Sequence, residues 1–118
     1  MGYDIKLLDK NKQIVKSERA LYNLGGYFTK DGIYDMECGI TYNYSSILKK
    51  VFPGTEGIRY LNNKIAESTY SVLDNAIKQL KDDYSDDYFE PTEGNVKQAL
   101  LSLYQMALRN PNAIWQIQ

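Results

Sequence analysis

The side chains that could do chemistry in this chain are tyrosines, carboxylates and cations, because it has eleven tyrosines and no histidine. Without histidine, a Ser-His-Asp or Cys-His arrangement and histidine ligation of a metal are excluded. Paired carboxylates such as Glu67 and Glu93 could act as acid and base only if the fold brought them together. Tyrosines instead supply flat surfaces with a polar tip, which suit ligand binding. We therefore expect a binding protein without catalytic activity, cofactor or metal.

One candidate binding motif is Thr41-Tyr42-Asn43-Tyr44-Ser45. Tyr42 and Tyr44 could stack on or flank a base, and the amide of Asn43 could donate to and accept from a polar edge. The alternative is purely structural, because tyrosine is common on half-buried strands. Both interpretations are open on the sequence alone.

A second motif, Thr92-Glu93-Gly94-Asn95, lies where a helix is expected to begin. Thr92 can accept from the free amides of the first turn, and the helix dipole favours Glu93 there. Gly94 is harder to explain, because glycine in a helix costs up to about 1 kcal/mol relative to alanine unless something needs close approach to the backbone. With Asn95 and Lys97 beside it, this helix start could hold an anion or the edge of a base. Plain helix capping is the alternative.

Two cations between these motifs could meet a phosphate or carboxylate. Arg59 follows a glycine-bearing loop, and Lys64 comes five residues later. An arginine fork suits bidentate binding of such anions, although a solvated surface pair would look the same in sequence. Glu67 is placed to cap the following helix, and it could equally hold a ribose hydroxyl or orient Arg59.

The largest charge feature is an acidic run over residues 82–90 with aromatic residues between the acids. It comprises Asp82, Asp83, Asp86, Asp87 and Glu90, with Tyr84, Tyr88 and Phe89 interleaved. The spacing lacks the alternating ligands and central glycine of a calcium loop. The segment could be only a solvated connector between two helices. The alternative is that it binds a protein partner with a basic surface.

Composition places the chain among ordinary globular domains. Its 118 residues, 43% of them hydrophobic and 25% charged, fit a single domain spanning 1–118. A net charge of -1 supplies no field for duplex nucleic acid. The lone Cys38 cannot form an intrachain disulfide, and no apolar run approaches the roughly 18 residues of a membrane span. We expect a cytoplasmic protein with no membrane partner.

Hydrophobic periodicity predicts strands first and helices later. A hairpin over residues 3–17 and a strand over 33–44 show alternation, while 44–52 has the spacing of a short helix. Two longer helices are expected over about 67–81 and about 92–110. Beyond them, the lone Trp115 could close a pocket or anchor the C-terminus on the core, and packing favours the second role. This order predicts an α+β fold, in which a small antiparallel sheet from the N-terminal half packs against two longer C-terminal helices plus one short helix.

These motifs together resemble a family of small phage- and prophage-encoded proteins of unassigned function. The matching positions are Ile40-Thr41-Tyr42-Asn43-Tyr44-Ser45, Gly57-Ile58-Arg59, Lys64 with Glu67-Ser68, Asp87-Tyr88-Phe89, and Thr92-Glu93-Gly94-Asn95 with Lys97. Asn63 and Phe89 depart from the pattern, since relatives tend to have glycine and tryptophan there. The first 39 residues match only loosely, apart from the paired glycines Gly25 and Gly26. The resemblance implies an accessory phage protein in the host bacterial cytoplasm, acting against host defence by sequestering a nucleotide-derived signal or blocking a defence enzyme.

The leading hypothesis is therefore a non-catalytic protein that sequesters a small anionic, nucleotide-like ligand, in a pocket shared within a homo-oligomer. The predicted ligand-binding residues are Tyr42, Asn43, Tyr44, Arg59, Lys64, Glu67, Thr92, Gly94, Asn95 and Lys97. The alternative hypothesis is a protein inhibitor of a host defence enzyme, which would use the acidic segment 82–90 to occupy a basic groove.

Overall fold

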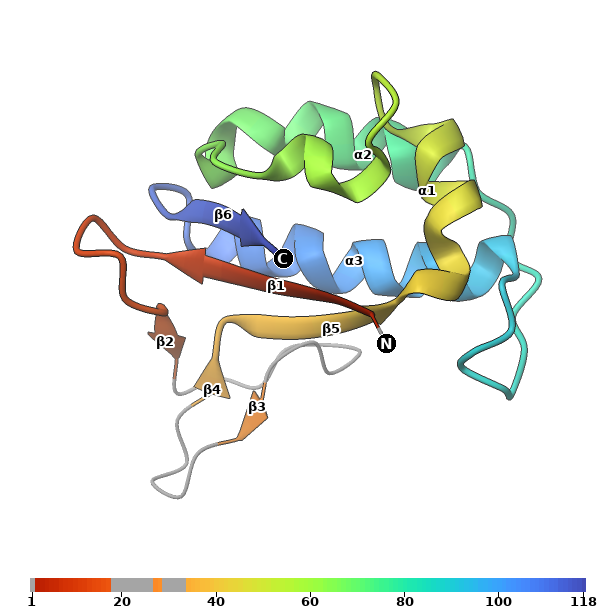
Figure 1. The fold of residues 1–118 in the computed structure, drawn as a ribbon, viewed down its shortest axis with the longest axis horizontal. Coiled ribbons are helices and arrows are strands. Elements are labelled where there is room, and N and C mark those ends of the chain that lie inside the picture. The colour runs from red at the N-terminus through yellow and green to blue at the C-terminus, as the bar shows by residue number, and fades with distance from the viewer. Residues whose placement is uncertain (1, 18–26, 29–33) are drawn as a thin grey trace.

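Short antiparallel sheets and three α-helices make up the part of the chain that the structure, a computed structural model, describes: residues 2–17, 27–28 and 34–118. The strands are β1 (Gly2–Leu8), β2 (Lys16–Ser17), β3 (Tyr27–Phe28), β4 (Tyr34–Asp35), β5 (Glu37–Thr41) and β6 (Ile114–Ile117). The helices are α1 (Ser45–Val51), α2 (Tyr70–Lys78) and α3 (Glu93–Arg109), with 3-10 turns η1 (Tyr42–Tyr44), η2 (Gly57–Leu61) and η3 (Ala66–Thr69). Figure 1 shows their arrangement.

The main sheet has the strand order β5-β1-β6, so β1 is central and pairs antiparallel with both neighbours. In its register Ile5 lies opposite Cys38 on one side and Ile117 on the other. Tyr3, Ile5 and Leu7 are buried, while the alternate residues of β1 are only partly covered. This period of two turns one face of the sheet toward the helices. The short strands form a second sheet, β2-β4-β3.

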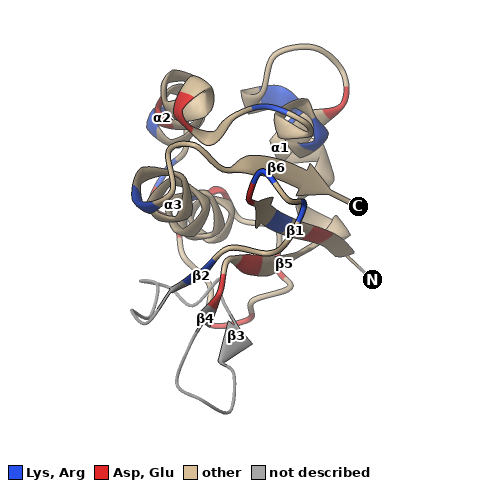
Figure 2. Cartoon of the chain, turned by 90° about the vertical axis from the view of Figure 1, so that its left-hand side faces the viewer, with Lys and Arg blue, Asp and Glu red and all other residues tan. Residues whose placement is uncertain are grey.

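The helices close the core with stripes at helical spacing. Val96, Leu100 and Leu103 of α3 are fully buried, and so are Leu73 and Ala76 of α2. The strands β6, β1 and β5 lie one below another in Figure 2, with α3 beside them.

Trp115 on β6 is completely buried and is among the largest side chains of the core. Its indole nitrogen Nε1 donates to the hydroxyl of Thr69 at 3.0 Å, so the polar end of the ring is satisfied inside the protein. The prediction that Trp115 anchors the C-terminal segment on the core is confirmed.

The predicted α+β class is confirmed, and so are the short helix over 44–52, seen as α1, and the long helix over 92–110, seen as α3. The helix expected over 67–81 is shorter, because its first turn is the 3-10 turn η3 and α2 ends at Lys78. The strands show three differences. The chain turns back after β1, with a bridge between Leu8 and Ile14, but β2 pairs with β4 in place of completing the expected hairpin. The strand expected over 33–44 is divided between β4 and β5, and its last three residues form η1. β6 was not expected and brings a C-terminal strand into the sheet. Gly25 and Gly26, which match the family pattern, lie outside the described residues.

None of the helices among the described residues has the length and apolar character needed to cross a membrane.

Replacing Trp115 with phenylalanine should lower the free energy of unfolding by about 1–3 kcal/mol, because it removes buried volume and the hydrogen bond to Thr69. Urea unfolding followed by circular dichroism measures the change. Leu108→Ala on α3 is the control, since that side chain is 51% exposed and the substitution should stay within about 0.5 kcal/mol. Equal stability of the two variants would contradict the anchoring role.

Candidate functional site

The two sequence motifs meet at the segment between α2 and α3, residues 82–90, which we call the acidic loop. Thr41 to Ser45 continue from the end of β5 through η1, and Thr92 to Asn95 form the first turn of α3. Both motifs contact the acidic loop. The loop lies at one end of the molecule, as the teal segment beside the start of α3 in Figure 1.

Asn95 holds the backbone of the acidic loop at three points. Its amide oxygen accepts from the backbone nitrogen of Ser85 at 3.0 Å. Its amide nitrogen donates to the carbonyls of Asp87 and Glu90, each at 3.0 Å. An asparagine amide has two N–H donors, so both are used inside the protein. Asn95 itself is only 8% exposed.

Gly94 lies against the loop with no room for a side chain. Its backbone nitrogen donates to Oδ1 of Asp83 at 2.9 Å. A Cβ atom at position 94 would lie 2.7 Å from the nitrogen of Tyr84 and 2.8 Å from the carbonyl carbon of Asp83. The sequence predicted close backbone approach at this glycine, and the group that approaches is the protein's own loop.

The remaining residues of this motif and its neighbour also hold the helix start and the loop. The Thr92 hydroxyl accepts from the backbone nitrogen of Asn95 at 3.0 Å, which confirms the predicted cap. Glu93 accepts from the backbone nitrogen of Lys81 at 3.1 Å. Lys97 forms an ion pair with Asp82 at 2.7 Å.

The first motif, Thr41 to Ser45, also binds the acidic loop. The buried Tyr44 donates its hydroxyl to the carbonyl of Tyr88, and Asn43 donates from its amide nitrogen to the carbonyl of Phe89 at 2.9 Å. In return, the Tyr88 hydroxyl donates to the carbonyl of Gly39 and accepts from the nitrogen of Thr41, both at 3.2 Å. The loop is thus tied to the free edge of β5.

The electrostatics of this region follow from the same contacts. The hydrogen bond with Asp82 raises the pKa of the Lys97 ammonium, and it lowers the pKa of the Asp82 carboxyl. Burial, followed by the nearby Tyr88 and Asp87, raises the pKa of the Tyr44 hydroxyl to about 12. Among the described residues, no other salt bridge reaches the acidic loop. The other four acids of the loop are exposed and form no salt bridge within the part of the chain that the structure describes.

The acidic loop exposes its aromatic residues although its backbone is held. Tyr84 is 48% exposed, Tyr88 46% and Phe89 59%. Every residue of the loop except Ser85 is exposed. Polar contacts rather than core burial therefore order this segment, including the turn in which Phe89 donates its backbone N–H to Oδ1 of Asp87 at 3.0 Å.

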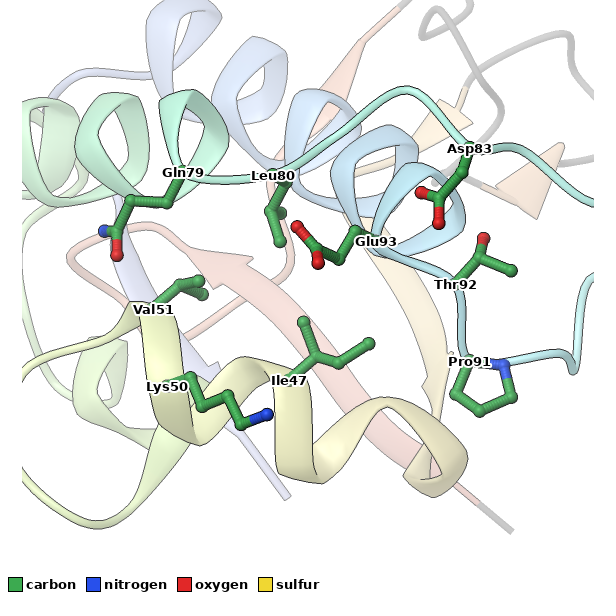
Figure 3. A pocket seen from close by; sticks show the side chains of 9 residues that line it. All are labelled: Ile47, Lys50, Val51, Gln79, Leu80, Asp83, Pro91, Thr92 and Glu93. Carbon is green, nitrogen blue, oxygen red and sulfur yellow. The ribbon is translucent and has the colours of Figure 1, made fainter.

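A hollow of about 490 Å³ lies beside the base of the loop, between α1 and the start of α3 (Figure 3). Its apolar surface comes from Ile47, Val51 and Leu80. The carboxylates of Glu93 and Asp83 also line it, and both already accept backbone N–H groups. Both carboxylates of this hollow are therefore already used to hold the protein's own backbone, and we assign no ligand to it.

The ten predicted ligand-binding residues do not form one site. Six of them, Asn43, Tyr44, Thr92, Gly94, Asn95 and Lys97, meet around the acidic loop. Tyr42 and Arg59 lie together at a separate hollow, where both contact the ring of Tyr3. Lys64 lies over the ring of Tyr60 at 3.9 Å and donates to its carbonyl, and Glu67 is an exposed acid in the first turn of η3. No group of described acidic or cysteine residues could hold a metal ion.

Two contributors to these sites were not predicted. Ser85, whose nitrogen binds Asn95, has no sequence signal that marks it. Tyr3 lies on an alternating strand, and the pattern predicts only that it is buried, without indicating the cation beside it.

Gly94→Ala should loosen the acidic loop. Alanine favours a helix by up to about 1 kcal/mol, but forcing a Cβ atom against two backbone atoms costs about 1–3 kcal/mol, so the net effect is destabilising. Hydrogen exchange should rise at residues 82–90 more than elsewhere. Gln98→Ala, an exposed position on the same helix, is the control and should leave exchange in the loop unchanged. Unaltered exchange in Gly94→Ala would show that the loop is not held by this contact.

Tyr44→Phe tests the buried hydroxyl through pH. The folded-state pKa of Tyr44 is raised from 10.0 to about 12, so its neutral form stabilises the fold fully below about pH 10, and this contribution is lost as pH rises toward 12. At pH 7 the variant should be less stable by about 0.5–1.5 kcal/mol because the hydrogen bond to Tyr88 is lost.

Urea unfolding at pH values from 7 to about 11 should then show the stability gap between wild type and Tyr44→Phe shrinking as pH rises. The matched control is Tyr42→Phe, because that ring is 39% exposed and lies outside the loop contacts. A gap of constant size across this range would contradict the assignment.

Comparisons with known proteins do not identify a family or a function for this chain. No protein-family model, no curated protein and no solved structure matches the chain. The resemblance to a phage family stays a prediction, and the function has to be inferred from the contacts of the described residues.

Proposed function

We propose that this protein binds another protein, without catalysis, by presenting the acidic loop to a basic surface that also has apolar pockets. The observation that carries the proposal is a solvent-exposed loop that is held by two separate motifs and still exposes three aromatic rings. Aromatic residues are enriched among the side chains that dominate binding energy at protein interfaces. A loop ordered before binding also loses less conformational entropy when it binds.

Charge supports the same choice of partner. The loop has five acids, and the ion pair with Lys97 compensates one of them. Complementary charge steers association and selects partners more than it adds affinity, and it is screened as salt rises. A basic groove with hydrophobic pockets would match both the acids and the exposed rings of Tyr84 and Phe89. The resemblance implies that this partner is a host defence enzyme, and the identity of the partner stays a prediction.

The contacts favour this proposal over ligand sequestration by Asn43 and Asn95. Asn43 and Asn95 were predicted to read the polar edges of a ligand, but their amide nitrogens donate to the backbone of the acidic loop. A ligand would have to displace these bonds, and two of them belong to the nearly buried amide of Asn95, whose loss of partners is costly. The same groups are better explained as the supports of a binding loop.

Binding should fail in two loop variants, Asp86→Lys and Phe89→Ala. Both side chains are exposed, and within the described residues neither holds a backbone group of the loop. The immobilised protein is incubated with bacterial lysate, and captured polypeptides are measured as salt is increased. We expect a stoichiometric, salt-sensitive partner that both loop variants lose.

Asp74→Lys is the matched control, because it makes the same charge change on α2 and costs only an exposed pair with Lys78. It should capture as much partner as the wild type. A polypeptide that all four proteins capture equally would place the contact elsewhere. A wild-type protein that releases only a nucleotide-like mass on mild denaturation would favour sequestration.

A further inference from the structure

A second hollow, of about 380 Å³, is lined by no residue of the acidic loop. Its volume falls in the range of about 300–1,000 Å³ typical of small-molecule sites. The lining side chains come from β1, η1, α1 and η2 with the preceding loop, and include Tyr3, Tyr42, Lys49, Thr55, Glu56 and Arg59. Two cations and two aromatic rings therefore meet in one place.

The cations of this hollow are available to an anion. Lys49 and Arg59 are both exposed, and within the described residues neither forms a salt bridge. The guanidinium carbon of Arg59 lies 4.8 Å from the centre of the Tyr3 ring, which orients it by a cation–π contact. An oriented guanidinium with an ammonium nearby is suited to a phosphate group.

An aromatic surface lies next to these charges. The ring of Tyr42 packs edge-on against Tyr3, with centroids 4.8 Å apart and planes at 88°, yet it remains 39% exposed. A tyrosine face fixed in this way can stack a flat heterocycle. Glu56 lines the same hollow, and its carboxylate would repel a free phosphate but accept from a hydroxyl or an exocyclic amine.

We infer that this hollow binds a small phosphorylated heterocycle of the mononucleotide class. The phosphate lies at Lys49 and Arg59, the ring stacks on Tyr42, and a hydroxyl or amine donates to Glu56. The site needs no contact from the acidic loop, so this inference can be tested independently of the proposed protein partner.

Titration of the ¹⁵N-labelled protein with adenosine monophosphate, followed by NMR, tests the inference. We expect saturable shifts at the residues that line the hollow, and weaker binding of adenosine and of inorganic phosphate alone. Lys49→Ala and Arg59→Ala should each weaken adenosine monophosphate by about tenfold, since each loses a charged contact. Tyr42→Ala should weaken adenosine monophosphate and adenosine together.

Lys50→Ala is the matched control, because it removes the same charge from the next residue of α1 and does not line this hollow. It should keep wild-type affinity, as should Asp86→Lys in the acidic loop. Absence of saturable shifts with adenosine monophosphate would overturn the inference. Equal losses in Lys49→Ala and Lys50→Ala would also overturn it, because they would indicate only a general attraction to positive charge.

Discussion

The hydrogen bonds of the Asn95 side chain are the interaction on which the candidate site depends. One nearly buried amide satisfies a nitrogen and two carbonyls of a loop that has no regular secondary structure of its own. A buried polar group that loses its partner costs more than the hydrogen bond contributes, so these three contacts form or break together. The position of Asn95 in the first turn of α3 then fixes the rest: the preceding glycine must touch the loop, and Thr92 must close the helix beneath it.

The acidic loop also covers part of the free edge of the main sheet. β5 is an outer strand, and such strands expose unpaired backbone groups that can pair with other chains. The Tyr88 hydroxyl occupies two of these groups, on Gly39 and Thr41. Holding the loop and covering the edge are therefore one arrangement, and a partner that engages Tyr88 contacts the main sheet through a single ring.

Much of the fold could be predicted from the sequence, because the patterns that indicate its elements are local. The stripes of α2 and α3, the cap at Thr92 and the alternation of β1 each depend on residues within a few turns of one another. Gly94 was informative for the same reason, since a glycine in a helix start indicates close approach. What approaches could not be predicted, because the loop 82–90 has no periodic pattern and is also held by Asn43 and Tyr44, which lie 46 and 44 residues away in the sequence from the loop residues that they bind. Asn63 has a positive φ of 67°, a backbone conformation that glycine adopts most readily and asparagine tolerates.

β6 was missed because four residues after a proline carry little pattern, and their partner strand lies at the other end of the printed sequence. That pairing has a consequence for how the protein is made. The middle strand β1 is synthesised more than a hundred residues before its neighbour β6, which carries the buried Trp115. Closing so long a segment of chain is entropically costly, and folds dominated by distant pairings form slowly. During synthesis, one side of β1 therefore stays unpaired until β6 has been made, and the main sheet cannot close before then.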